Sequence, residues 1–345
     1  MIASELRQDP ATKEWVVIAP ERSQRPKPAK RPRPDLHTFY SSQCPFCPGN
    51  ESLTPSDVLR IGREAAAWQV RVVPNKFPAL QPNTPPVSKN CFYRNAAGCG
   101  YHEVIIESPA HNLELADMPE EHIARILRAY RQRQTLMLEK DDVRSVVIFR
   151  NYGEHAGTSL LHPHSQLLAT SIVPAYVQWK QEVAERHFEE TGRNLYSDIC
   201  EAEKWAGVRL IEEDRQFTAF VPYAASVPYE MWIVPIALSP TFALASDDAL
   251  ADLAGALRRC LLRLRHCCGD VDYNYVIHSC AKGEEAENYY LWHLQIIPRL
   301  TEPAGFELGS HMYINPMRPE DCAQQLREAA ITIAEPVGLS YELSA

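Results

Sequence analysis

The sequence predicts an α+β protein of two tandem domains, each an antiparallel sheet with packed helices, related by internal duplication. The length of 345 residues suffices for two domains of ordinary size. Short apolar runs bounded by proline, glycine and asparagine alternate with long amphipathic segments. The same order of strands around one long helix occurs in both halves, so we expect domains at residues 1–172 and 173–345.

The first half begins with a basic, proline-rich segment between two regions of alternating strand pattern. Residues 5–20 predict a short hairpin, and five prolines between residues 20 and 34 exclude a helix or central strand there and predict an extended arm. A helix from Met118 to about Lys140 follows from its apolar stripe and the start signal at Asp117 and Pro119. The expected strands are 15–19, 68–80 (ending in a proline-bounded turn), 104–107, 146–149 and 160–170.

The second half shows the same alternation. Residues 175–190 predict a helix that ends at Gly192, and residues 247–266 predict a second long amphipathic helix. A short helix is expected after Pro319. The expected strands are 217–222, 232–235, 275–278 and 292–298.

Composition and charge narrow the class of protein. The formal net charge of −9 argues against a broad nucleic-acid surface but allows a small anionic ligand held by a few arginines. No apolar run reaches the ~18–20 residues of a membrane span, and the first ten residues lack the apolar core of a secretory signal. Ten unevenly spaced cysteines then predict free thiols in a cytoplasmic protein, with one possible metal site.

The most informative stretch is His162-Pro163-His164-Ser165-Gln166, which leads into an apolar strand. Residues two apart share one face of a strand, so His162, His164 and Gln166 are expected to point the same way. A solvated strand face would explain the same pattern. A functional explanation is a cleft or ligand toward which the three polar side chains converge.

A second motif is Cys44-Pro45-Phe46-Cys47, followed by Pro48 and Gly49. Proline and glycine turn the backbone so that both sulfurs can face one ion, as tetrahedral zinc requires. A thioredoxin-like redox pair is the alternative, but no strand precedes the motif and no clear helix follows it. Zinc is therefore favoured, with two further ligands to be found elsewhere in the chain.

Comparison of the two halves suggests those ligands. Aligning His162-Pro163-His164 with His293-Leu294-Gln295 matches His111 to Leu238 and Cys44 to Ser197. The second half then keeps only Cys200 and His293 of a matched set. Loss of a complete set in one half is expected if the first half holds one zinc ion with Cys44, Cys47, His111 and His162. A second metal is expected to be lost or weak, and His164 remains free for another role.

A free histidine beside a glutamine suits phosphoryl chemistry. A neutral imidazole attacks phosphorus, and it needs its other ring nitrogen to donate to a fixed acceptor, for which a carbonyl of the His162-Pro163 backbone is available. Gln166 can donate to a phosphate oxygen, and the loop Gly157-Thr158-Ser159 can present backbone N–H groups. The sequence contains neither a Walker loop nor a serine nucleophile elbow.

Together these features resemble the transferase branch of the histidine triad superfamily, the galactose-1-phosphate uridylyltransferase family, which also includes ADP-glucose phosphorylase. The features are the His-x-His-x-Gln strand, the duplicated halves, the Cys44–Cys47 motif, the Arg22 and Arg25 arm and the Gly305-Phe306-Glu307 tail. The resemblance covers roughly residues 5–325. It implies two histidine-triad-like domains: a catalytic, zinc-containing first domain and a degenerate second domain that carries a sugar-site tail.

The resemblance also implies a ping-pong mechanism. His164 would accept a nucleoside monophosphate from a nucleotide sugar, releasing a sugar 1-phosphate, and then pass it to a second sugar phosphate or to inorganic phosphate. Gln166 would bind the reacting phosphate. A homodimer is implied because the tail reaches the sugar in the partner subunit. The implied substrate-binding residues are Arg22, Arg25, Asn75, Asn151, Ser159, Phe306 and Glu307.

Several substitutions bear on the substrate. Many uridylyltransferases have glycine at the place of Ser165 and tyrosine at the place of Phe306. The serine and phenylalanine found here are more typical of ADP-glucose phosphorylases. In some uridylyltransferases a histidine at the place of Gln295 helps to hold a second metal. We favour uridylyl transfer between UDP-glucose and a hexose 1-phosphate, as in galactose metabolism, with adenylyl transfer from ADP-glucose to phosphate as the main alternative. Simple nucleotide hydrolysis and a non-catalytic zinc-binding module are further alternatives.

Overall fold

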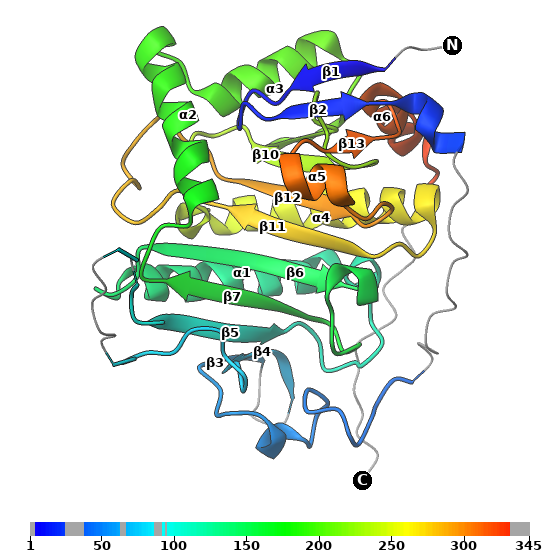
Figure 1. Cartoon of the computed structure of the whole chain (residues 1–345). Coiled ribbons are helices and arrows are strands. Elements are labelled where there is room, and N and C mark those ends of the chain that lie inside the picture. The colour runs from blue at the N-terminus through cyan, green and yellow to red at the C-terminus, as the bar shows by residue number, and fades with distance from the viewer. Residues whose placement is uncertain (1–3, 25–37, 63–66, 86–91, 94, 332–345) are drawn as a thin grey trace.

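The computed structural model describes residues 4–24, 38–62, 67–85, 92–93 and 95–331. Its centre is a ten-stranded sheet in which all neighbouring strands run antiparallel (Figure 1). In spatial order the strands are β3 (Leu59–Gly62), β4 (Trp68–Pro74), β5 (Gly100–Ile106), β7 (His164–Thr170), β6 (Ser145–Tyr152), β11 (Tyr273–His278), β12 (His293–Pro298), β10 (Met231–Pro235), β9 (Phe217–Phe220) and β8 (Leu210–Glu213).

The two halves of the chain share this sheet. Sequence analysis predicts one sheet per half, but β6 pairs with β11 from Tyr152↔Tyr273 to Ile148↔Ile277, which joins them. From each outer edge inward, the order is β3-β4-β5-β7-β6 in the first half and β8-β9-β10-β12-β11 in the second. Pairing of two otherwise exposed edge strands satisfies their backbone groups, which explains why the half-sheets do not remain separate.

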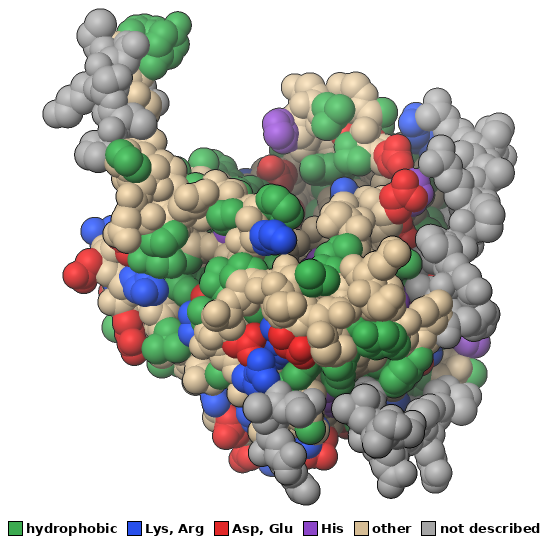
Figure 2. All heavy atoms as spheres, turned by 90° about the horizontal axis from the view of Figure 1, so that it is seen from below, with side chains coloured by type: hydrophobic (Ala, Val, Ile, Leu, Met, Phe, Trp, Pro, Cys, Tyr) green, Lys and Arg blue, Asp and Glu red, His purple; other side chains and the backbone are tan. Residues whose placement is uncertain are grey.

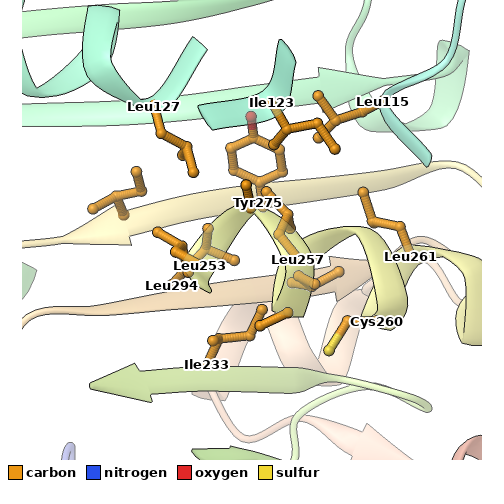
Figure 3. Close-up of a cluster of buried hydrophobic side chains, with 14 of the residues drawn as sticks. Leu115, Ile123, Leu127, Ile233, Leu253, Leu257, Cys260, Leu261, Tyr275 and Leu294 are labelled. Carbon is orange, nitrogen blue, oxygen red and sulfur yellow. The ribbon is translucent and has the colours of Figure 1, made fainter. Parts of the chain in front are cut away.

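One face of the sheet is covered by two long helices, α1 (Glu120–Leu138) and α4 (Asp247–Cys268), which pack side by side. Both were predicted, with bounds that differ by at most two residues. Figure 3 shows leucine and isoleucine side chains of the two helices meeting Tyr275, Leu294 and Ile233 of the sheet. Each fully buried side chain of this size contributes about 1.5–3 kcal/mol.

The other face differs between the halves. Over the second half lie α2 (Ala175–Thr191) and α3 (Leu195–Ala206), together with a small sheet of β1 (Glu5–Gln8), β2 (Trp15–Ile18) and β13 (Ile314–Asn315) (Figure 1). Helix α3 was not predicted; it begins where Asn194 Oδ1 accepts from the N–H groups of Tyr196 and Ser197. Cys200 therefore lies inside a helix, and the expected counterpart of the Cys44–Cys47 motif at 197–200 is wrong.

The N-terminal hairpin is confirmed, but it packs on the second half. Arg7 donates to Glu320 of α6 (Pro319–Glu328), the helix predicted after Pro319, and to the carbonyl of Tyr223. Where an extended arm is expected, Pro20–Gln24 form a 3₁₀ helix, since proline at a first helical position lacks only an N–H that would be unpaired anyway. The rest of that arm lies outside the described residues.

The remaining elements are short. Residues 305–310, which include the Gly305-Phe306-Glu307 tail, form α5 (Gly305–Ser310). Four 3₁₀ turns complete the described chain: Glu51–Leu53, Leu115–Asp117, Glu154–Ala156 and Phe242–Leu244.

The described helices include none that is both long and apolar enough to cross a membrane. On the face seen in Figure 2, acidic, basic and apolar side chains are interspersed, and no continuous basic stripe is visible.

Candidate active site and metal centre

Strand β7 separates two environments. Its odd-numbered residues Leu167 and Ala169 belong to the core beneath α1 and α4, so His164 and Gln166 lie on the opposite face. Opposite them on β5 stand Ile106 and Val104, which pack with Cys44, Phe46 and Cys47. The Cys44–Cys47 motif therefore lies directly over the start of β7.

His162 precedes the strand, contrary to the expectation that it shares the strand face of His164. Its Nε2–H donates to the carbonyl of Ser108 over 2.7 Å, which leaves the Nδ1 lone pair free. This Nδ1 lies 3.7 Å from Cys44 Sγ and 3.6 Å from Cys47 Sγ. Burial lowers the pKa of His162 to about 3, so the ring is neutral, as a metal ligand must be.

The four expected ligands come together. His111 Nδ1 lies 3.4 Å from Cys47 Sγ, and one donor atom from each of the four residues lies within 4.8 Å of all the others. Tetrahedral zinc with bonds of about 2.0–2.3 Å places its donor atoms about 3.3–3.8 Å apart, close to these distances. Without a cation, burial raises the pKa of the Cys47 thiol to about 11 and so favours the protonated form. A bound metal ion would favour the thiolate instead. The donor set fits zinc.

Local backbone contacts build the cysteine turn. Asn50 Nδ2 donates to the carbonyls of Ser41 and Cys44, at 3.1 and 2.8 Å. Gly49 adopts a φ of +87°, which side chains other than glycine rarely accept. The N–H of Cys47 bonds the carbonyl of Cys44, so the two sulfurs are held on one side of the turn.

His164 has one ring nitrogen bound to the backbone and the other without a described partner. Its Nδ1–H donates over 2.8 Å to the carbonyl of His162, as predicted, which leaves the lone pair on Nε2. Nε2 has no hydrogen-bond partner among the described residues. It is not completely buried either. Burial lowers the pKa of the ring, which favours the neutral form, and the Phe46 ring packs against it at 5.4 Å.

Gln166 contacts a histidine that the sequence motifs did not single out. Gln166 Oε1 lies 2.8 Å from Nε2 of His102, on the neighbouring strand β5. A sequence signal existed, because His102 is a polar residue two positions before the apolar run 104–106 and so shares one strand face with Val104.

The remaining substrate-binding candidates are dispersed. Asn75 lies beside His102, with Nδ2 3.2 Å from its Nε2. Asn151 Oδ1 accepts from Asn274, and Ser159 is exposed on the loop before β7. Arg22 is exposed on the 3₁₀ helix Pro20–Gln24, and Arg25 lies outside the described residues. Phe306 and Glu307 lie on α5, where the Glu307 carboxylate accepts from the N–H of Ala304, and no described hydrogen bond joins either residue to His164 or Gln166.

A buried polar network lies beneath β7. Tyr130 of α1 bonds Ser165 and Tyr275 at 2.6 Å each and Glu107 at 3.1 Å. Glu107 also pairs with Arg150, whose Nε lies 2.9 Å from its Oε2. The sequence offered one signal for this pair: Glu107 and Arg150 each directly follow an apolar strand segment. Because Tyr275 belongs to β11, this network ties β7 to the second half.

The structure corrects the alignment of the halves at this point. His293 is the first residue of β12, as His164 is of β7, and each Nδ1 bonds the carbonyl two residues earlier. Gln295, like Gln166, accepts from a histidine Nε2 at 2.8 Å, here that of His278. The matches of His164 with Gln295 and of His162 with His293 are therefore wrong by two residues.

The second-half histidine is enclosed. His293 stacks between Trp232 and His278, with ring centroids 4.7 and 4.8 Å away, and is fully buried. Its Nε2 lies 3.0 Å from Nζ of Lys180, which comes from α2. In the second half, the atom equivalent to Nε2 of His164 therefore contacts a lysine.

Comparisons with known proteins show which proteins this chain resembles. A family model described as "Galactose-1-phosphate uridyl transferase, N-terminal domain" matches residues 1–174. ADP-glucose phosphorylase of Arabidopsis thaliana is 37% identical over 95% of this chain and 93% of its own length. Galactose-1-phosphate uridylyltransferase of Thermotoga maritima is 27% identical over 95% of this chain and 99% of its own.

Solved structures show the same relationship. A crystal structure of the Arabidopsis thaliana ADP-glucose phosphorylase with bound ADP-glucose has a TM-score of 0.83 and 35% identity, covering 96% of this chain and 100% of the other. A structure of uridylyltransferase has a TM-score of 0.75 and 28% identity, covering 95% and 98%.

Proposed function

The chain belongs to the galactose-1-phosphate uridyl transferase family and is a nucleotidyltransferase, and from this premise we propose that it transfers a nucleoside monophosphate from a nucleotide sugar through a covalent His164 intermediate. The observation that carries the proposal is the fixed tautomer of His164. Its Nδ1–H is bound to the carbonyl of His162, and its Nε2 lone pair has no partner among the described residues.

The proposed first step is an in-line displacement. Nε2 of His164 attacks the α-phosphorus of the nucleotide sugar, so an N–P bond forms. The bond from that phosphorus to the bridging oxygen breaks, and its electron pair leaves with the sugar 1-phosphate. The Nδ1–H stays on the ring throughout, and the His162 carbonyl stabilises the positive charge that the phosphorylated ring acquires. In the second step, a phosphate oxygen of the acceptor displaces Nε2 in the same way.

We propose that Cys44, Cys47, His111 and His162 hold zinc. When bound, the ion supplies a structural crosslink between the cysteine turn and the start of β7. His162 and His164 are two residues apart, and the His162 carbonyl accepts from His164, so a fixed His162 backbone fixes the nucleophile. No catalytic step needs the metal itself.

Substrate contacts and assembly extend the proposal. The phosphate would contact Gln166, with Asn151 and Ser159 lining its pocket, and the nucleotide would lie near Asn75, Arg22 and Arg25. Phe306 and Glu307 would reach the sugar in the partner subunit of a homodimer, which is consistent with the lack of a described hydrogen bond from either residue to His164 within one chain. We also propose that the halves 1–172 and 173–345 arose by duplication, a view supported by their matching strand order.

The donor is proposed at two levels. The nucleotide-sugar class rests on the whole family. Within it, 37% identity to an ADP-glucose phosphorylase against 27% to a uridylyltransferase favours adenylyl transfer from ADP-glucose to phosphate. Uridylyl transfer from UDP-glucose to a hexose 1-phosphate, the function that sequence analysis favours, is the second candidate, supported by several relatives named galactose-1-phosphate uridylyltransferase.

Intact-protein mass spectrometry after incubation with ADP-glucose or UDP-glucose tests both levels. An adenylyl adduct on His164 supports the first donor, and a uridylyl adduct supports the second. The His164→Ala variant should retain the fold and zinc but form no adduct. Absence of an adduct from either donor, or normal turnover by this variant, would refute the covalent mechanism.

A further inference from the structure

We propose that His102 is a positioning residue that orients the side-chain amide of Gln166, so that its N–H₂ group faces the reacting phosphate. This inference rests on the proposed function, because it explains how the Gln166 amide is oriented toward the phosphate. His102 itself is not placed in contact with substrate.

The tautomer of His102 follows from a backbone contact. The N–H of Ala79 donates to Nδ1 of His102 over 3.1 Å, so Nδ1 carries the lone pair. In the neutral ring the hydrogen is then on Nε2, which lies 2.8 Å from Gln166 Oε1. The ring therefore donates to the oxygen of Gln166 and selects one of the two orientations that the amide could take.

The consequence is a directed donor. With Oε1 engaged by His102, the Nε2 hydrogens of Gln166 have no acceptor among the described residues. Gln166 shares a strand face with His164, two residues away. An amide turned the other way would present its oxygen to an anionic phosphate and repel it. The His102 contact thus decides whether the Gln166 amide attracts or repels the phosphate.

Asn75 is drawn into the same arrangement. Its Oδ1 accepts from the N–H of Phe77 over 2.9 Å, which places Nδ2 toward His102 Nε2 at 3.2 Å. Both of these atoms carry hydrogens in the tautomer derived above, so the contact is not a hydrogen bond. Asn75 Nδ2 therefore also needs an acceptor, and a substrate oxygen between Asn75 and Gln166 would satisfy both amides.

The second half supplies an independent comparison. His278 donates to Gln295 Oε1 at the same 2.8 Å, although it lies on β11 rather than on a counterpart of β5. There the amide Nε2 of Gln295 has a protein acceptor, Glu230 Oε1 at 2.8 Å. The two glutamine amides differ in that acceptor: it is a carboxylate in the second half, and no described group in the first half. An anionic ligand oxygen would fill the place that Glu230 fills.

A double-mutant cycle tests the proposal. His102→Leu should slow adduct formation about tenfold in single-turnover measurements at saturating nucleotide sugar, with the half-saturating concentration changed less than about twofold. His102→Gln, whose amide N–H can reach Gln166 Oε1, should recover most of the rate. In a Gln166→Ala background, His102→Leu should cost less than about twofold, because the group through which it acts is gone.

Controls separate this outcome from loss of structure. Zinc content and thermal midpoint are measured for every variant, and His187→Leu, a change on α2 where His187 pairs with Asp198, should leave the rate unaltered. Equal losses from His102→Leu in both backgrounds, or none in either, would overturn the positioning role while leaving His164 chemistry intact. Failure of the proposed function itself would appear differently, as adduct formation by His164→Ala or as no adduct in the unmodified protein.

Discussion

The buried pair of Glu107 and Arg150 offers a quantitative test of how the start of β7 is held in place. Glu107 is 0% and Arg150 2% exposed, and the carboxylate accepts from Arg150 Nε at 2.9 and 3.2 Å. The backbone N–H of Glu107 also donates to the carbonyl of Pro163, between His162 and His164. Glu107→Gln keeps the shape but leaves Arg150 as an uncompensated buried charge, which typically costs about 3–5 kcal/mol.

The assay is urea and thermal unfolding of the zinc-loaded protein. For a chain of this size about 2 °C per kcal/mol gives an expected fall in Tm of about 6–10 °C. Arg150→Met should destabilise similarly, and the double variant should lose much less than the sum, because neither charge then remains unpaired. Arg193→Met, which removes an exposed pair with Asp198 and Glu201, is the control and should change the midpoint little.

Strict additivity of the two buried substitutions would refute this reasoning, since it would show that the charges do not compensate each other. A Glu107→Gln midpoint equal to that of the unmodified protein would do so as well.

Three further predictions follow from the structure. Cys47→Ser should abolish stoichiometric zinc binding and lower the thermal midpoint, measured by metal analysis and melting, whereas Cys260→Ser, outside the cluster, should keep the metal. Burial lowers the pKa of Lys180 to about 8 from 10.5, so the unfolded chain binds the extra proton between these values and stability should rise with pH across that window; Lys180→Met should remove this rise in urea midpoints. Leu257→Ala in the α1–α4 core should cost about 2–5 kcal/mol in urea unfolding, and wild-type-like stability would contradict the packing in Figure 3.

Local patterns were sufficient for most of the fold. The apolar stripes of α1 and α4 predicted their bounds closely, because amphipathic periodicity over about twenty residues is a strong signal. Several features were not predicted, including the short strands β3 and β8, the helix α3 and the pairing of β6 with β11. The helix α3 begins at an Asn194 cap whose meaning depends on the following turn, and the pairing of β6 with β11 is a tertiary contact that leaves no local pattern.

The residues of the metal site and the active site were predicted, but the residues that hold them in place were not. Cys44, Cys47, His111 and His162 meet as expected: the Cys-x-x-Cys spacing predicted a metal site, and comparison of the two halves suggested the two histidines although its register was wrong by two residues. His102 and Tyr130 act from β5 and α1, far from His164 along the chain, and only strand register and helix packing bring them near β7. Such supporting contacts follow from the assembled fold rather than from any motif.

The two-residue error in aligning the halves shows which features carry structural information. Alignment on the histidines of two similar tripeptides matched His162 to His293, whereas the hydrogen bonds match the pair His164 and Gln166 to the pair His293 and Gln295. Both halves therefore keep a histidine that bonds its own preceding backbone and a glutamine oriented by a second histidine. The difference lies in what covers that face: the cysteine turn over the start of β7, but α2 with Lys180 over β12. Because Nε2 of His293 meets Nζ of Lys180 whereas Nε2 of His164 has no described hydrogen-bond partner, His164 is the one of the two that keeps a lone pair available to a ligand.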